Sequence, residues 1–494
     1  MFFRLFSSKW IFALVLIFLL GSGAFLRFTD LSAPLLEFHP TRQLFGAVKA
    51  RGIYYSTVPN LPAWQKDLAV RQYEGEATIE PPLMENAAAF LYGYFGEQTS
   101  IPRAFSASFW LIGALFSFLL SKNLTGSSAA AAGSLAFMLL LPYAVTASRV
   151  FQPDPLMVML IIIFWWGIEN WGRNPNWMWT FISGLIGGLA IFVKLPAAFF
   201  IIGGALGAII AHVGLIKSLK LPQVWVTAIL GILPPAAYMY YGIVMKGFLG
   251  KQFNGRFNPE LWFSPYFYLR WFLKLENVVS VLWIALALLG WLVFASRPVK
   301  IFLSGLWAAY FVYGMTFAHY ISSHDYYSLP LIPIAALSLA PIAVEMFPVF
   351  SRKIQFSRSL QLISLVLLLI SISLLSIDQY LTRSKNDYQP QAAFWAEVGD
   401  AIGHQPGLIA LTTDYGYPLA YYGWQKSDPW PLAPDIENFD DTFARLTGKK
   451  SYFLINDFEE YARQPKLQKR LTDSYPVLIQ GKGFLVFDLL HPKK

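Results

Sequence analysis

The residues with the clearest capacity for chemistry lie directly after the first apolar segment of the sequence. The stretch "LLEFHPTRQ" places an acid, an imidazole, a guanidinium and an amide within seven positions, as Glu37, His39, Arg42 and Gln43. A carboxylate at the edge of a bilayer can accept the proton of an attacking hydroxyl, and a guanidinium can hold a phosphate through two hydrogen bonds. The same residues also suit anchoring at the membrane surface, because charges beside a first membrane helix are common.

Further polar residues stand at short breaks between apolar runs. Asp154 follows Arg149 in "SRVFQPDPLMV", and Lys194 interrupts "GLAIFVKLPAAFF". Asp154 could simply cap a helix, whereas Lys194 could extend to the surface or bind an anion such as a lipid phosphate. Glu80 precedes a double proline, which either aims its carboxylate into a shared cavity or leaves it as a solvated loop acid.

The segment "SSHDYYSLPLIP" adds His324, Asp325, Tyr326 and Tyr327 at the mouth of a later apolar run. Tyrosines at an interface usually belong to an aromatic belt, but the histidine and aspartate offer donor and acceptor groups at neutral pH. The sequence contains no cysteine, zinc motif, nucleophile elbow or phosphate-binding loop. Covalent catalysis and nucleotide hydrolysis are therefore not expected, and an activated substrate drawn from the lipid is the simplest source of reactivity.

Composition indicates which elements must position these residues. Hydrophobic residues make up 56% of the 494-residue chain, which is typical of a polytopic α-helical membrane protein. The net charge of +9 is spread between apolar runs, so no nucleic-acid partner is expected. A spanning helix needs about 20 mostly apolar residues. About eleven segments meet this test, at 10–28, 103–120, 128–147, 156–171, 177–193, 196–216, 223–243, 277–295, 301–318, 328–346 and 359–377.

The distribution of basic residues predicts the orientation in the membrane. Lysines and arginines concentrate in alternate connections, which predicts a cytoplasmic N-terminus. The candidate residues then all lie on the extracytoplasmic face, in the long loop 29–102 and in later short turns. The tail lies on the same face. The loop 29–102 contains two stretches with helical spacing that suit helices lying in the membrane interface.

The composition changes from about residue 388. Short apolar runs, "GLIALTTD", "SYFLIND" and "GFLVFDL", alternate with helical patterns. This alternation predicts a small soluble α/β domain over 388–494, following a multi-helix transmembrane domain over 1–387.

The order of these segments resembles a known family. "EFHPTRQ", "EPPLMENAAAFLYGYFG", "IPRAFSASFWLIGALFSFLL" and "SRVFQPDPLMV" are similar to successive motifs of glycosyltransferase family 39, the protein O-mannosyltransferase (PMT) and aminoarabinose transferase group. "GLIGGLAIFVKLPAAFF" and "HDYYSLPLIP" are similar to later segments of the same family. The resemblance covers roughly residues 1–380 and implies a GT-C fold.

The resemblance also implies a function and roles for individual residues. It implies transfer of a sugar from a polyprenyl-phosphate donor to a lipid, glycan or protein acceptor, with Glu37 as the base or acceptor-orienting carboxylate and Asp154 across the same cavity. Arg42, Arg149 and Lys194 become candidates for the lipid phosphate. Two positions depart from the family: Glu37 lacks the acidic neighbour that many members carry, and Glu80 replaces a lysine found in some.

Membrane lipid and the polyprenyl-phosphate sugar are the expected partners, and a bacterial inner (plasma) membrane is the expected location. The sequence names no cofactor and leaves metal dependence open. Two rivals remain: a transporter or flippase for a lipid-linked glycan, which would place polar residues near the bilayer midplane, and a non-catalytic envelope assembly protein.

Overall fold

The computed structural model describes residues 9–59, 61–250, 255–353 and 358–493. Its contacts divide the chain into two compact units. The first unit comprises Met1–Leu31, Ala77–Leu83 and Arg103–Lys385, and the second comprises Ser32–Glu76, Met84–Pro102 and Asn386–Lys494. Contacts thus group most of the long outer loop with the tail, although the sequence analysis placed this loop with the helices. The boundary between residues 387 and 388 stays a prediction.

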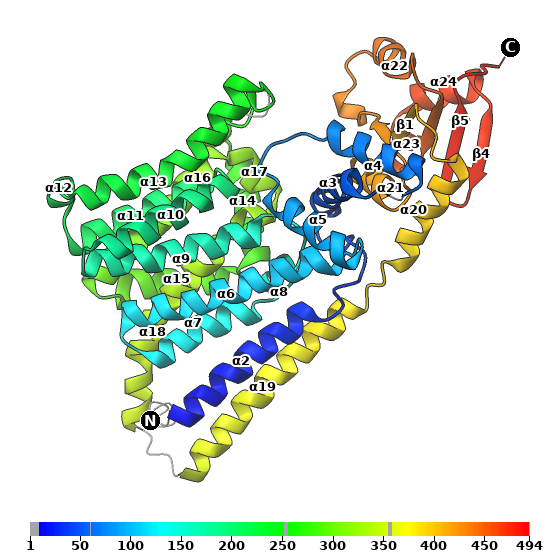
Figure 1. Cartoon of the computed structure of the whole chain (residues 1–494). Helices are drawn as coiled ribbons and strands as arrows, with labels where there is room; N and C mark the ends of the chain where they lie inside the picture. Colours follow the sequence, from blue (N-terminus) through cyan, green and yellow to red (C-terminus); the bar gives the residue numbers. More distant parts are fainter. Residues whose placement is uncertain (1–8, 60, 251–254, 354–357, 494) are drawn as a thin grey trace. The chain divides into compact units, whose positions relative to one another are not determined.

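The first unit is built entirely of helices among its described residues (Figure 1). Its long helices are α2 (Lys9–Phe28), α6 (Ser100–Thr125), α7 (Ser128–Leu140), α9 (Asp154–Arg173), α10 (Trp177–Val193), α11 (Ala197–His212), α13 (Pro222–Met239), α14 (Pro265–Val278), α16 (Arg297–Thr316), α18 (Leu331–Lys353) and α19 (Arg358–Ser384). Shorter elements connect them: α8 (Pro142–Ala147), α12 (Leu215–Ser218), α15 (Val281–Leu289), α17 (Ala318–Ser323), the π-helices η1 (Tyr240–Met245) and η4 (Gly290–Phe294), and the 3-10 helices η3 (Pro259–Phe263) and η5 (Asp325–Ser328).

Seven helices in the described ranges are long and apolar enough to cross a membrane, or up to eight if a pair bent by 90° counts as one span. That pair consists of Pro265–Val278 and Val281–Phe294. Three other expected segments form shorter apolar helices, α7, α10 and α11. The membrane character of the fold is confirmed, whereas the count of about eleven spans stays a prediction.

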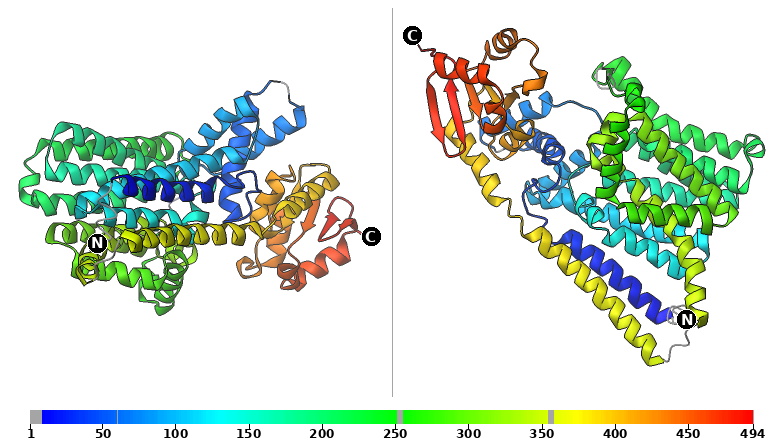
Figure 2. Two further views of the ribbon diagram at one scale, coloured as in Figure 1. Left: turned by 90° about the horizontal axis from the view of Figure 1, so that it is seen from below. Right: turned by 180° about the vertical axis from the view of Figure 1, so that it is seen from behind.

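The centre of the helical unit is α9, which is buried along most of its length. Helix α10 packs against both α9 and α13, and α11 packs against both α9 and α16. Helix α2 runs alongside α19 in each view (Figure 2). These contacts bring the beginning of α9 and the connection between α10 and α11 to the same end of the bundle. Three candidate residues lie there: Asp154, Lys194 and Glu80.

Helix α13 is unusual because Pro234 and Pro235 lie inside it. Pro234 has no N–H to donate to the carbonyl of Leu230, one turn earlier. Helix α10 approaches this carbonyl through Gly188: a β-carbon at that position would lie 2.3 Å from the Leu230 oxygen. Only glycine permits this approach of the two helices.

The second unit contains a five-stranded sheet, which confirms the predicted α/β character of the tail. Its strands are β1 (Leu408–Leu411), β2 (Ser427–Pro429), β3 (Tyr452–Ile455), β4 (Val477–Gly481) and β5 (Phe484–Asp488), in the order β2-β1-β3-β5-β4. The pairings of β1 with β2 and β3 are parallel, and those of β5 with β3 and β4 are antiparallel. Helices α20 (Gln389–Ile402) and α21 (Tyr417–Tyr421) pack on one face of the sheet, and α22 (Phe439–Thr447) and α24 (Pro465–Ser474) pack on the other. Helix α23 (Phe458–Ala462) follows β3.

The outer loop contributes three helices, α3 (Pro40–Thr57), α4 (Ala63–Gly75) and α5 (Leu83–Phe95). Arg51 of α3 joins this loop to the tail. Its guanidinium pairs with Glu97, donates a 2.6 Å hydrogen bond to the carbonyl of Tyr421, and lies 3.9 Å and 4.0 Å from the ring centroids of Tyr421 and Trp424. A charged side chain that is only 5% exposed is stable here because each of its faces has a partner.

Candidate functional site

Asp154 begins helix α9, where a carboxylate also benefits from the positive end of the helix dipole. The side chain is 2% exposed, and each carboxylate oxygen accepts a 2.9 Å hydrogen bond from Nζ of Lys194. The simple capping interpretation of Asp154 is therefore incomplete, because its carboxylate forms a buried ion pair between two helix ends.

Lys194 follows the last residue of α10, at the negative end of that helix dipole. Besides Asp154, its ammonium nitrogen lies 3.8 Å from Oε1 of Glu80. It also lies 5.6 Å and 5.5 Å from the ring centroids of Tyr326 and Tyr327. Two carboxylates and two aromatic rings thus surround one cation, so Lys194 does not extend to the surface as an isolated lysine would.

Tyrosines build the wall beside this cation. The Tyr327 ring stacks against Tyr320 at 5.4 Å and against Tyr313 at 6.3 Å. Tyr326 is only 5% exposed, so it is not a residue of an aromatic belt in contact with lipid headgroups. Asp325, in the same short helix η5, interacts with the hydroxyl of Tyr143, and the neighbouring His324 lies against Tyr326. The segment 324–327 therefore forms part of the site.

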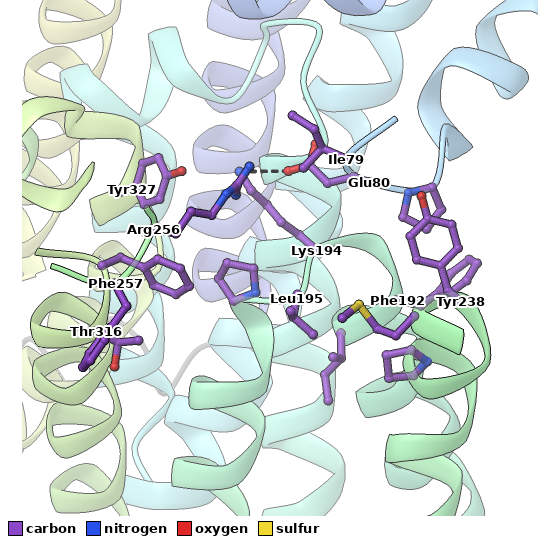
Figure 3. A pocket seen from close by; sticks show the side chains of 16 residues that line it. Ile79, Glu80, Phe192, Lys194, Leu195, Tyr238, Arg256, Phe257, Thr316 and Tyr327 are labelled. Carbon is purple, nitrogen blue, oxygen red and sulfur yellow. Dashed lines mark ion pairs between the residues drawn. The ribbon is translucent and has the colours of Figure 1, made fainter. Parts of the chain in front are cut away.

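A cavity of about 250 Å³ opens next to Lys194. Figure 3 shows that Lys194, Glu80, Arg256 and Tyr327 lie at one end of it, while the remaining walls are largely apolar. The apolar lining includes Ile191, Phe192, Leu195, Pro235, Met239 and Phe317. A polar, partly cationic end joined to apolar walls suits a ligand with a charged head and a hydrocarbon body.

An apolar groove of about 450 Å³ continues this cavity. Both are lined by Ile191, Leu195, Pro235 and Met239. The groove extends to Trp171, near the end of α9 opposite Asp154. Because α9 rises about 1.5 Å per residue, its 20 residues span roughly 30 Å, about the thickness of a bilayer core. The helical unit therefore contains a continuous apolar surface along most of that distance.

Arg149 is fully buried in the same unit, next to the end of α2. Its Nη2 donates hydrogen bonds of 2.7 Å and 2.8 Å to the carbonyls of Thr29 and Asp30. Arg103 donates to the same Asp30 carbonyl at 3.3 Å. These contacts hold the start of the outer loop, and a phosphate-binding role for Arg149 stays a prediction.

The four candidate residues of the first loop belong to the second unit. Gln43 is fully buried and donates a 2.7 Å hydrogen bond to the carbonyl of Phe38. His39 has a left-handed backbone with φ of 45° and packs edge-on against the Phe38 ring. Arg42 lies 6.0 Å from the Phe45 ring. The hydrogen bond of Gln43 fixes the turn that carries Glu37, and a substrate-binding role for these four residues stays a prediction.

Glu37 is half-buried and lies near Tyr388, the residue that precedes α20. Burial raises the pKa of Tyr388, and the negative charge of Glu37 raises it further. The structure thus groups the candidates into two sets. One set lies in the first, helical unit and comprises Glu80, Asp154, Lys194, Tyr326 and Tyr327. The other lies in the second unit, which we call the outer unit after the outer loop it contains, and comprises Glu37, His39, Arg42 and Gln43. The expected meeting of Glu37 with Asp154 stays a prediction.

Part of the chain matches a known protein family, and its fold matches solved structures. Residues 80–241, which include Glu80, Arg149, Asp154 and Lys194, match the family model described as dolichyl-phosphate-mannose-protein mannosyltransferase. The crystal structure of ArnT from Cupriavidus metallidurans in the apo state aligns with a TM-score of 0.60 at 16% identity, covering 97% of this chain and 98% of that one. The chain has a GT-C fold with a PMT-like central segment.

A second ArnT structure, bound to undecaprenyl phosphate, aligns over the same shares of both chains with a TM-score of 0.55 and 16% identity. The Archaeoglobus fulgidus oligosaccharyltransferase in the apo form aligns with a TM-score of 0.49 at 11% identity, over 95% of this chain and 74% of that one. No curated protein sequence matches the chain significantly. The resemblance inferred from the ordered motifs is confirmed, and the GT-C fold extends it to nearly the whole chain.

The candidate site also contains residues that no sequence motif distinguishes. Arg256 stands in an irregular loop, in which no sequence motif marks it. Tyr143 follows a proline within an apolar run and carries no motif of its own. Among the residues for which the structure gives positions, no group of three or more His, Cys, Asp or Glu could hold a metal ion.

Proposed function

We propose that the protein is a membrane glycosyltransferase that moves a sugar from a polyprenyl-phosphate donor to a lipid, glycan or protein acceptor on the extracytoplasmic face. The observation that carries the proposal is the cavity in which Lys194 and Arg256 stand at the end of a long apolar surface. A polyprenyl-phosphate sugar has the matching chemistry, with an anionic phosphodiester on a hydrocarbon chain. The ArnT structure bound to undecaprenyl phosphate gives independent support.

In the proposed reaction, an acceptor hydroxyl oxygen forms a bond to the anomeric carbon while the bond from that carbon to the phosphate oxygen breaks. Polyprenyl phosphate leaves with the bonding electrons, and the acceptor proton passes to a carboxylate, for which Glu37 is the proposed base. If the acceptor is itself an anionic phosphate, no base is needed and Glu37 acts by orientation only. Lys194 and Arg256 would stabilise the negative charge that develops on the leaving phosphate.

Asp154 and Glu80 have a different proposed task. An ammonium group with two carboxylates nearby is held in place before a ligand binds, so it need not reorganise during the reaction. Asp154, with two hydrogen bonds to Nζ, fixes the lysine. Glu80, at 3.8 Å, is the looser partner and is the carboxylate that an incoming phosphate would displace.

The distribution of charge disfavours the transporter alternative. Between Asp154 and Glu169, helix α9 carries no charged residue. Glu169 pairs with Arg173 and His212 at the far end of the helix. A substrate path through the bilayer would require polar groups near the midplane, and the central helix of this unit has its charges at its two ends.

The decisive experiment measures sugar transfer by the purified full chain, using a panel of labelled undecaprenyl-phosphate sugars and extracted envelope material as the acceptor. We expect transfer with at least one donor, and a fall of about 10²–10³ in rate for Lys194→Ala and Arg256→Ala, as for the loss of a group that stabilises developing charge. Lys220→Ala, an exposed lysine far from the site, is the matched control. Movement of the lipid-linked sugar across vesicles without transfer would support the transporter instead, and inactivity with every donor would contradict the enzyme.

A further inference from the structure

The carboxyl ends of strands β1 and β3 form a distinctive edge of the C-terminal sheet. After β1 the chain continues into α21, whose Leu419 packs on the face that α20 covers. After β3 it continues through α23 into α24, whose Leu467 and Leu471 pack on the opposite face. The connections from two adjacent parallel strands therefore diverge to opposite faces. The carboxyl ends of the strands at such a switch point are where open α/β sheets commonly bind ligands.

Polar and aromatic residues occupy this switch point. Thr412, directly after β1, donates a 3.4 Å hydrogen bond to the side-chain oxygen of Asn456, directly after β3. The chain then forms a turn in which Asp414, Tyr415 and Gly416 have φ values of 50°, 56° and 80°. Two successive non-glycine residues with left-handed backbones are energetically costly and persist only where the surroundings hold them. The turn leaves the Tyr415 ring 72% exposed.

The same turn contacts the segment that carries Glu37. The Thr41 hydroxyl donates a 3.2 Å hydrogen bond to Oδ1 of Asp414. His39 acts electrostatically on Asp414, which shows that its imidazole lies close to that carboxylate. Nearby, the backbone N–H of Leu35 donates a 2.6 Å hydrogen bond to the Tyr422 hydroxyl. The edge of the sheet and the segment that carries Glu37 are thus packed together. The contacts that join them come from residues before and after Glu37 in the sequence.

We propose that Asp414 and Tyr415 form the acceptor subsite, and that it binds a sugar of a glycan or glycolipid headgroup. This inference rests on the proposed glycosyltransferase function. A carboxylate has about four lone-pair positions, so one hydrogen bond from Thr41 leaves capacity for the hydroxyl groups of a sugar. The exposed Tyr415 ring offers a flat apolar surface with a polar hydroxyl, which suits a ligand that is itself amphipathic. The C-terminal domain then brings the acceptor to Glu37.

The left-handed backbone of Asp414 and Tyr415 has a role in the proposed subsite. In an ordinary right-handed or extended conformation, residue 415 would direct its side chain elsewhere. The left-handed pair aims the ring outward while Asp414 stays against Thr41. Glycine adopts such a backbone without strain, so Tyr415→Gly removes the ring and keeps the turn. This variant separates loss of binding from loss of folding.

The test uses the full chain in detergent, with the donor that the panel identifies and octyl β-glucoside as the acceptor probe that presents a sugar headgroup. We expect Asp414→Asn and Tyr415→Gly each to raise the KM for octyl β-glucoside by about tenfold, the effect of losing one or two good contacts. The KM for the donor is expected to stay unchanged. Tyr415→Phe, which keeps the ring and loses the hydroxyl, should raise this KM less than Tyr415→Gly does. Asp473→Asn, which changes an exposed acid on α24, is the matched control and should behave as the parent protein.

The outcomes separate this proposal from the proposed function. A parent protein that transfers sugar, combined with unchanged acceptor KM values in both variants, overturns the acceptor subsite and leaves the glycosyltransferase intact. An equal rise in the donor and acceptor KM values also overturns it, because that pattern indicates general damage to the site. A parent protein without any transfer overturns the glycosyltransferase itself. The thermal midpoint of Tyr415→Gly should equal or exceed that of the parent.

Discussion

The two units hold their candidate residues by different means. In the helical unit, Asp154 and Lys194 form an ion pair at the ends of two helices, with side chains 2% and 7% exposed. In the outer unit, Glu37 stands on a half-buried turn held by single hydrogen bonds, such as that from Thr41 to Asp414. A buried pair is rigid and costly to break, whereas a half-buried turn can adjust. The proposed binding of a phosphate would benefit from the first arrangement, and the proposed entry and release of an acceptor would benefit from the second.

The largest expected effect comes from breaking the buried pair. Replacing Asp154 with Ala leaves Lys194 buried with only the more distant Glu80, and we expect the free energy of unfolding to fall by about 3–5 kcal/mol. Thermal unfolding in detergent measures the change. Combining Asp154→Leu with Lys194→Met removes both charges, so it should recover much of the stability but none of the transfer activity. If the double variant were no more stable than the single one, the pair would not be the source of the loss.

A smaller effect is expected at Arg51, a buried link between the outer loop and the tail. Arg51→Ala removes the pairing with Glu97 and the contacts with two aromatic rings, so the outer unit should lose about 3 kcal/mol of stability. Limited proteolysis should then cleave residues 386–494 faster than in the parent. Arg470→Ala is the control, because the pair that Arg470 forms with Asp440 is exposed and should contribute less than about 1 kcal/mol. Equal cleavage rates in the two variants would contradict the distinction between buried and exposed pairs.

The smallest expected effect is a pH dependence confined to the outer unit. Burial raises the pKa of Glu76 above its ordinary 4.5, although the hydrogen bond from Tyr417 opposes this shift. The folded state therefore binds a proton more tightly than the unfolded state. The resulting stability is fully present below the ordinary pKa and is lost as the pH rises through the folded pKa. Burial raises the pKa of Asp414 in the same direction.

In Glu76→Gln, the stability of the outer unit should therefore fall less steeply as the pH rises above 4.5. The remaining fall is the contribution of Asp414. Proteolysis or hydrogen exchange over a pH series measures it, with the exposed Glu74→Gln as the control. A steeper decline in Glu76→Gln than in the parent would show that the sign is wrong.

The sequence predicted the type of each unit because local patterns encode it. Long apolar runs predict the helices, and the alternating runs after residue 388 predict the sheet and its covering helices. The motif "SRVFQPDPLMV" identified Asp154 before any partner was known. The pairing of Asp154 with Lys194 could not be read from the sequence, because it depends on which helix ends meet in space.

Other features had no local signal. The hydrogen bond between Thr41 and Asp414 joins residues 373 positions apart, and although Thr41 lies in the motif "EFHPTRQ", nothing in the sequence marks Asp414 as its partner. Arg256 is one arginine in an irregular loop, and only the cavity beside Lys194 distinguishes it from other basic residues. Long-range packing decided these contacts, and the sequence motifs similar to the family end before residue 380, so they carried no information on the tail.

The approach of Gly188 to the Leu230 carbonyl constrains how a lipid can enter the groove. Because no side chain separates the two backbones at Gly188, helices α10 and α13 pack closely there, and parting them would lose these contacts. A lipid chain that reaches the proposed groove would therefore enter along another border, such as the one that α11 forms.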